Sequence, residues 1–186
     1  TTRDVAEKYG YEPIRYMMVS CQYRSPINYS YEVIEQAKNS LERLYNCRDN
    51  IDFALKNAKD GGEAPEFIEK RKQEFIAAMD DDLNTADALA AIFMLVRDIN
   101  TFIAEGAGKT ALEACADMFD QLTGVLGLVY NRKTEALDSD IEALIEQRTA
   151  ARKAKDFAKA DELRDKIGEL GYIVEETRQG TKIKKK

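Results

Sequence analysis

The sequence predicts a mainly α-helical protein: an antiparallel helical bundle followed by a small C-terminal α+β domain with a hairpin. Three observations predict this fold. The prolines are Pro13, Pro26 and Pro65, so the remainder of the chain contains no obligatory helix breaker. Apolar residues recur at steps of three and four, the spacing of one helical face. Near the C-terminus, "YIVEET" and "TKI" flank "RQG" and have the composition of two short strands joined by a turn.

The first 30 residues form the least regular part of the predicted fold. The dense apolar stretch "IRYMMVSCQY" predicts a helix. We expect "RSPINYS" to be extended, because the residue before a proline avoids helical dihedral angles. Residues 1–30 are therefore assigned to a linker region between helices.

A helical bundle is predicted over residues 31–137. Ser30 is a suitable N-cap for a first helix, which should end near Ala58, where "KDGGEAP" follows. A second helix begins near Pro65 and is interrupted by "DDDLNT". Asn84 or Thr85 can cap the third helix, "ADALAAIFMLVRDINTFIA", whose apolar residues form a wide stripe toward a core.

Capping signals predict the remaining helices and the small domain at residues 138–186. Thr110 with Glu113, and Ser139 with Glu142, match the capping box, in which a hydroxyl and a carboxylate bond the free amides of a helix start. Asp156 can cap the last helix, and a glycine at position 171 suits its C-terminus.

Composition narrows the class of protein. The chain has 44% hydrophobic and 33% charged residues, and no apolar run approaches the ~20 residues that cross a bilayer. The start "TTRDVAEKYG" has neither an initiator Met nor a signal-peptide layout, so we expect a piece of a longer protein. Three widely spaced cysteines suit packing roles in a reducing compartment such as the cytoplasm.

Histidine is absent from the sequence, which removes the commonest general base and most zinc ligand sets. We therefore expect no catalytic residue and no metal ligand here. Two short motifs have both a ligand-binding and a structural interpretation. "GAGKT" resembles the end of a P-loop, but Ile103 stands where that motif needs its first glycine. "MDDD", residues 79–82, has oxygen ligands for Mg²⁺, although acids beside a helix start are commoner as structural residues.

Charge is segregated along the chain. Residues 141–186 hold 12 Lys and Arg against 9 Asp and Glu, whereas residues 1–140 hold 16 against 25. A polyanion should therefore be attracted to the C-terminal end. There, "ARKAKDFAKADELRDKI" places Phe157 and Asp161 beside a basic cluster. An apolar ring is ordinarily buried, but beside a basic patch an exposed Phe can stack on a single-stranded base, worth ~1–3 kcal/mol.

Three passages together resemble one family. They are "RDVAEKYGYEPIRYMMVSCQYRSPINYS", "FIAAMDDDLNTADALAAIFMLVRDIN" and "LIEQRTAARKAKDFAKADELRDKIGELGYIVEETRQGT". In this order they resemble the C-terminal half of cysteinyl-tRNA synthetase, a class I aminoacyl-tRNA synthetase. The resemblance implies a stem-contact region, a helical-bundle anticodon-binding domain and a small domain that grips the anticodon. It also implies that the catalytic domain, with its ATP and zinc sites, is missing from this chain.

The resemblance also implies site residues. The anticodon-contacting positions of the family fall on Arg152, Phe157, Asp161 and Glu176. Phe157 stands where relatives often have Trp, and Glu176 where they often have Asp, so stacking is kept and hydrogen-bond geometry is altered. The tRNA phosphates would meet a second set of residues, Arg148, Lys153, Lys155 and Lys182.

The expected partner is a cysteine-specific tRNA, with no DNA and no membrane, bound by a monomer. The rival interpretation is a non-catalytic helical protein-interaction module whose C-terminal charge keeps it dissolved. An autonomous enzyme is opposed by the missing histidine, and the related cysteine-ligating enzymes of small-thiol biosynthesis lack the full anticodon-binding tail.

Overall fold

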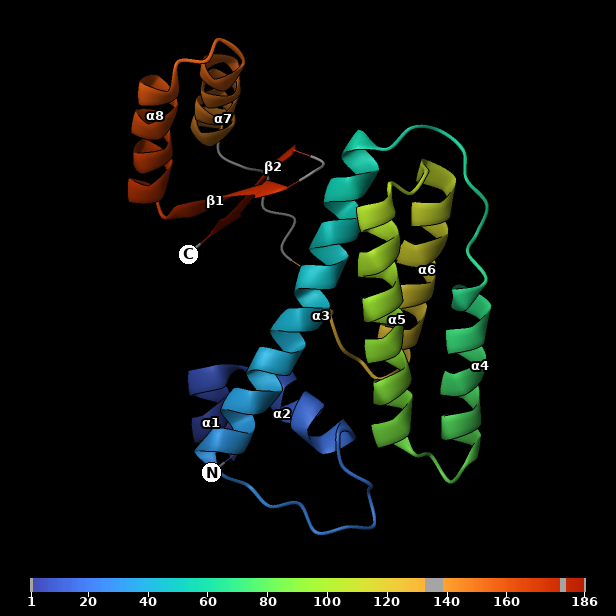
Figure 1. Ribbon diagram of the computed structural model, residues 1–186. Helices are drawn as coiled ribbons and strands as arrows, with labels where there is room; N and C mark the ends of the chain where they lie inside the picture. The colour runs from blue at the N-terminus through green and yellow to red at the C-terminus, as the bar shows by residue number, and fades with distance from the viewer. Residues whose placement is uncertain (1, 133–138, 178–179, 186) are drawn as a thin grey trace. The chain divides into compact units, whose positions relative to one another are not determined.

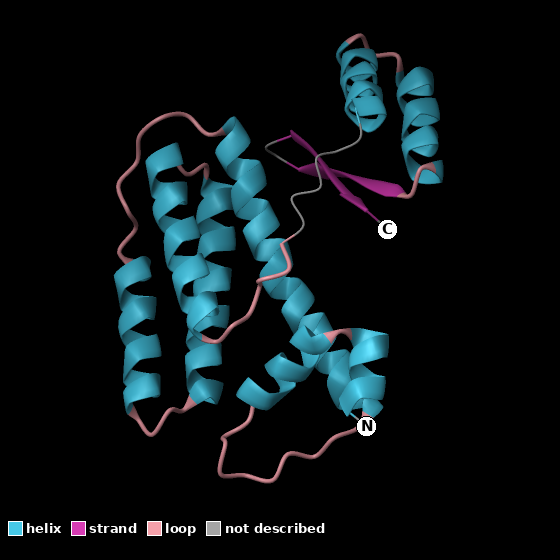
Figure 2. Cartoon of the chain, turned by 180° about the vertical axis from the view of Figure 1, so that it is seen from behind, coloured by secondary structure: helices cyan, strands magenta, loops and turns pink. Residues whose placement is uncertain are grey.

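Helices account for most of the residues that the computed structural model describes, which are 2–132, 139–177 and 180–185 (Figure 1). The chain divides into two units, residues 1–132 and 133–186. The first contains α1 (Thr2–Tyr9), α2 (Tyr11–Val19), α3 (Tyr31–Asn57), α4 (Phe67–Asp80), α5 (Thr85–Glu105) and α6 (Lys109–Val125). The second contains α7 (Ser139–Lys153), α8 (Phe157–Glu169), β1 (Tyr172–Thr177) and β2 (Gly180–Lys185). The prediction of a mainly α fold is confirmed (Figure 2).

The apolar faces predicted from spacing form the core of the first unit. In Figure 1, α3, α4, α5 and α6 lie side by side, and α1 and α2 lie near the N-terminal end of α3. The residues at its centre are almost completely excluded from solvent: Ile34, Leu44, Ile51, Ile92, Leu95, Ile99, Leu112 and Phe119. None of the helices in the described ranges has both the length and the apolar character needed to span a bilayer.

Three predicted N-caps are confirmed. The side chain of Ser30 accepts a hydrogen bond from the N–H of Val33 at 3.3 Å, at the start of α3. Of the two candidates for α5, Asn84 is the cap, and it accepts from the N–H of Asp87 at 3.1 Å. Asp156 accepts from the N–H of Lys159 at 3.1 Å and begins α8. Each cap satisfies an amide that has no partner within its helix.

The start of α6 differs from the prediction. Thr110 is not the N-cap, because α6 begins at Lys109 after Gly108. The N–H groups of Lys109 and Thr110 donate instead to the carbonyls of Lys59 at 2.9 Å and Gly61 at 3.1 Å. A Cβ on Gly108 would lie 2.3 Å from the Gly61 oxygen, so this close approach requires glycine. The loop after α3 thus replaces the capping side chain.

The N-terminal region is more helical than predicted. The structure contains α1, which the sequence interpretation omitted, and α2 begins at Tyr11 rather than near Ile14. Gly10 separates the two helices with a φ of 81°, in the left-handed region. An eight-residue helix is marginal alone, so α1 depends on packing, with Ala6 buried in the core.

The two short motifs, "GAGKT" and "MDDD", make structural contacts. Ile103 lies inside α5, and Gly106 is the left-handed C-cap of that helix, so "GAGKT" is a helix–turn–helix junction. The carboxylate of Asp82 accepts hydrogen bonds from the Tyr23 hydroxyl at 3.0 Å and from Arg24 at 3.1 Å. Among the described residues, no group of three or more side chains is arranged to hold a metal ion.

A buried carboxylate fixes the end of the first unit. Glu12 on α2 is only 4% exposed and accepts hydrogen bonds from the Tyr45 hydroxyl at 2.7 Å and from the N–H of Val129. The Tyr45 oxygen in turn accepts from the N–H of Asn131 at 3.0 Å. Burial and the neighbouring Glu12 carboxylate raise the pKa of Tyr45, so its hydroxyl keeps the proton it donates. Val129 has a φ of 59°, which is strained for a β-branched residue.

Candidate nucleic-acid interface

A tight turn joins α7 to α8 and presents a lysine. The N–H of Asp156 donates to the carbonyl of Ala151 at 2.9 Å, and the N–H of Lys155 donates to that of Arg152 at 3.0 Å. This pair of bonds is the Schellman motif, whose left-handed position usually holds glycine. Lys155 occupies that position with a φ of 60°. The turn therefore holds an exposed cation in a conformation that costs a non-glycine residue energy.

Phe157 is the first residue of α8, and its ring is 60% exposed. The core face of α8 is formed by Ala160, Leu163 and Ile167 instead. Asp161 is also exposed and lies one turn after Phe157. The open interpretation of Phe157 as a core residue is therefore not supported, and the ring and the carboxylate share one exposed helix face.

Arg164 extends this face and was missed by the sequence interpretation. It is exposed and lies three residues after Asp161 and seven after Phe157, so all three side chains stand on one stripe of α8. That spacing was visible in the sequence and could have identified it. Toward the end of α8, a groove of about 540 Å³ lies between the helix and β1, with Arg164 and Ile173 among its lining residues.

Two further cations flank the turn. Arg152 and Lys153 are exposed in the last turn of α7, where positive charge also suits the helix dipole. Together with Lys155 they lie within five residues of Phe157 in the sequence. The described part of the site thus brings together an open aromatic face, a carboxylate and a cluster of cations.

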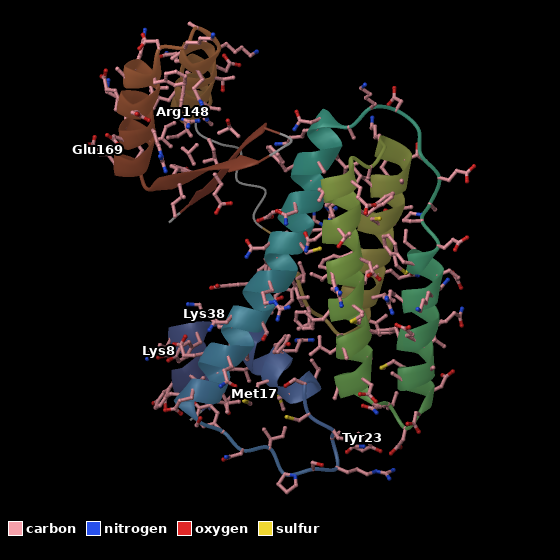
Figure 3. The ribbon with its side chains drawn as sticks, viewed as in Figure 1. Lys8, Met17, Tyr23, Lys38, Arg148 and Glu169 are labelled. Atoms are coloured by element: carbon pink, nitrogen blue, oxygen red, sulfur yellow. The ribbon has the colours of Figure 1, made fainter. Side chains whose placement is uncertain are left out.

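Arg148 does not belong to this surface. Arg148, which is labelled on α7 in Figure 3, is 5% exposed. Ile141 and Ala151 are buried on the same face of the helix. The predicted phosphate contact of Arg148 therefore has no support from the structure, because a buried guanidinium is not presented to an RNA backbone. Its spacing, seven residues after Ile141 and three before Ala151, places it on the apolar face of the helix.

The last two predicted residues lie on the strands. Glu176 is on β1, opposite Thr181, and Lys182 is on β2, opposite Glu175. Their side chains fall outside the described part of the structure. Residues 178–179, which belong to the predicted turn between the strands, also fall outside it. The side chains of the Ser139 and Glu142 capping box also fall outside it.

Two protein-family models match the chain. The DALR domain matches residues 74–131, and the cysteinyl-tRNA ligase anticodon binding domain matches residues 134–183. The first match runs from the second half of α4 through α6, and the second covers nearly all of the unit that contains Phe157.

Curated relatives match along the whole chain. Cysteine–tRNA ligase of Clostridioides difficile (strain 630) is 42% identical over 191 residues, covering 100% of this chain and 41% of the relative. The cysteine–tRNA ligase of Caldicellulosiruptor saccharolyticus is also 42% identical, with the same coverage. That of Brevibacillus brevis is 41% identical and covers 99% of this chain and 41% of the relative. The chain therefore spans about two fifths of the length of these relatives.

Proposed function

The chain belongs to the cysteinyl-tRNA ligase family and carries its anticodon-binding domains, and we propose that α8 and its preceding turn read the anticodon of a cysteine tRNA. The observation that carries the proposal is the 60% exposed ring of Phe157 at the head of α8. An unstacked anticodon base can lie on this ring, because every base offers a π face.

The surrounding side chains have separate roles in the proposal. Lys153, Lys155 and Lys182 meet phosphates, which hold the RNA without reading its sequence. Asp161 accepts a hydrogen bond from a base amino group. This contact favours a base with an amino donor over one with a carbonyl at the same position. Arg152 and Glu176 make the remaining polar contacts to the bases.

The whole protein, on this proposal, joins L-cysteine to its tRNA with ATP in the cytoplasm, as a monomer. The described residues supply tRNA recognition in this proposal. We divide the tRNA-binding part into a stem-contact region at residues 1–30, a helical bundle at 31–137 and an anticodon-reading domain at 138–186. The buried free thiols of Cys47 and Cys115 are compatible with a reducing environment.

Binding titrations with two RNAs test the proposed function. The chain should bind cysteine tRNA at least about tenfold more tightly than the same tRNA with a replaced anticodon, since each lost base contact costs roughly 1–3 kcal/mol. Equal affinity for the two RNAs would support the rival, a helical protein-interaction module, and contradict anticodon reading.

Replacing Lys155 with Gly should weaken tRNA binding without lowering the stability of the fold. The substitution removes a cation while relieving the left-handed backbone, so we expect a Tm within a few degrees of that of the unchanged chain. The log–log dependence of tRNA affinity on salt should become shallower by about 0.7, the loss of one phosphate contact.

Lys155→Asn is the matched control, because Asn tolerates the same conformation and also lacks the charge. Both variants should show the same salt dependence. A salt slope identical to that of the unchanged chain would remove Lys155 from the interface.

A further inference from the structure

A polar groove lies between two helices of the first unit, whereas the residues assigned to the anticodon belong to the second unit. It has a volume of about 260 Å³. Helices α3 and α5, which form it, lie side by side in Figures 1 and 2. The lining residues that matter are Arg43, Asn46 and Asn50 from α3, and Phe93, Arg97 and Asn100 from α5. Two guanidinium groups and three amides thus line a groove whose lining includes no acidic side chain.

This concentration of cations is unusual for its surroundings. Residues 1–140 have 25 acidic against 16 basic side chains, and several other arginines of the unit are paired with them. Arg48 contacts two carboxylates, those of Asp52 and Asp120, and Arg71 contacts those of Glu74 and Asp98.

Arg43 and Arg97 are both exposed, and neither forms an ion pair with any residue of the described ranges. Arg43 lies instead over the ring of Phe93, with 4.7 Å between the guanidinium carbon and the ring centroid. This contact orients a cation at the groove and covers the aromatic face that a base would otherwise use. An anion is the missing complement of this pair of guanidiniums.

The amides narrow the class of ligand. The Nδ2 of Asn50 donates to the Oδ1 of Asn100 at 3.0 Å, so a bond between α3 and α5 fixes the orientation of both amides in the groove. Amides donate and accept hydrogen bonds, whereas guanidinium groups only donate. A ribose–phosphate backbone presents charged acceptors and hydroxyl groups together, which matches this mixture better than a carboxylate-rich peptide does.

We propose that the groove between α3 and α5 binds the ribose–phosphate backbone of the tRNA at a point other than the anticodon. The proposal rests on the proposed function, because the RNA partner is taken from it. Contacts of this kind position an RNA and carry no base sequence. The groove would therefore add affinity for the whole tRNA without adding discrimination between anticodons.

The double variant R43Q/R97Q tests the groove in the full chain. Its affinity for cysteine tRNA should fall about tenfold or more, and the salt slope should become shallower by about 1–2, from the loss of two phosphate contacts. The ratio of affinities for cysteine tRNA and its anticodon-replaced form should stay unchanged. Because both arginines are exposed and only the cation–π contact of Arg43 is lost, the circular dichroism spectrum should be unchanged and Tm should fall by no more than a few degrees.

The charge-matched control is K38Q/K72Q, which removes two lysines of the same unit that do not line the groove. It should lower tRNA affinity by less than about twofold, as expected for distant surface charges. Asn46→Glu, which keeps both arginines and adds an acid to the groove, should weaken tRNA binding as R43Q/R97Q does.

The outcomes separate the two proposals. If R43Q/R97Q binds tRNA as tightly as the control variant, the groove proposal is overturned, whatever the anticodon dependence. If R43Q/R97Q weakens binding but the unchanged chain does not distinguish anticodons, the groove proposal stands and the proposed function fails. If R43Q/R97Q loses affinity for an acidic peptide but keeps its affinity for tRNA, the groove binds a protein partner and the proposal is overturned.

Discussion

Replacing Phe157 with Ala is expected to weaken binding of cysteine tRNA by about 5- to 150-fold, which corresponds to ~1–3 kcal/mol for one base stacked on an aromatic ring. The free energy of unfolding should change by less than about 1 kcal/mol, because a ring that is 60% exposed contributes little to the core. Titration with tRNA and thermal unfolding of the same variant measure the two quantities.

Phe157→Trp provides the matched control. It keeps a stacking face at the head of α8 and should retain most of the affinity that the alanine variant loses. A Tm that drops by many degrees in the alanine variant would instead show that the ring supports the fold. An alanine variant that binds as tightly as the unchanged chain would remove base stacking from the proposal.

Glu12→Ala should lower the stability of the first unit by about 2–4 kcal/mol. The substitution leaves two donors without their acceptor, the half-buried Tyr45 hydroxyl and the buried Val129 N–H, and each unsatisfied buried donor costs roughly 1–3 kcal/mol. It also releases the restraint on the strained backbone of Val129. Urea unfolding followed by circular dichroism measures the change.

Two further variants serve as controls for Glu12→Ala. Glu12→Gln keeps one oxygen acceptor and should lose less stability than the alanine variant. Glu7→Ala removes an exposed carboxylate from α1 and should change the free energy of unfolding by less than about 0.5 kcal/mol. Equal stability of the Glu12 and Glu7 variants would mean that the buried contacts at the end of the unit contribute nothing.

Short sequence motifs predict the features that depend on interactions between residues close together in the chain, such as helix N-caps. The caps at Ser30, Asn84 and Asp156 were predictable, because an N-cap side chain bonds an amide only three residues away. Thr110 matched the same pattern, yet the loop carbonyls of Lys59 and Gly61 satisfy the amides of α6. That contact joins parts of the chain far apart in sequence, which a local pattern does not contain.

The candidate site also has features that the sequence predicts and features that depend on the tertiary fold. Residue types and spacing placed Phe157 and Asp161 together, but burial and exposure of the ring remained open alternatives until the structure placed Ala160, Leu163 and Ile167 on the core face. Arg148 was predicted as a member of the basic cluster at the end of its helix, but it lies on the buried face of α7. The groove between α3 and α5 could not be predicted, because its lining comes from two helices that only the tertiary fold brings together.

The pairing of elements in the second unit has a kinetic consequence. Its contacts join neighbours in the chain: α7 with α8, α8 with β1, and β1 with β2. Chains whose contacts are this local reach their native state within roughly microseconds to milliseconds, because little loop entropy is lost before the first contacts form. After a transient opening, the unit should therefore refold within the time of one typical enzyme turnover, which is roughly a millisecond to a second.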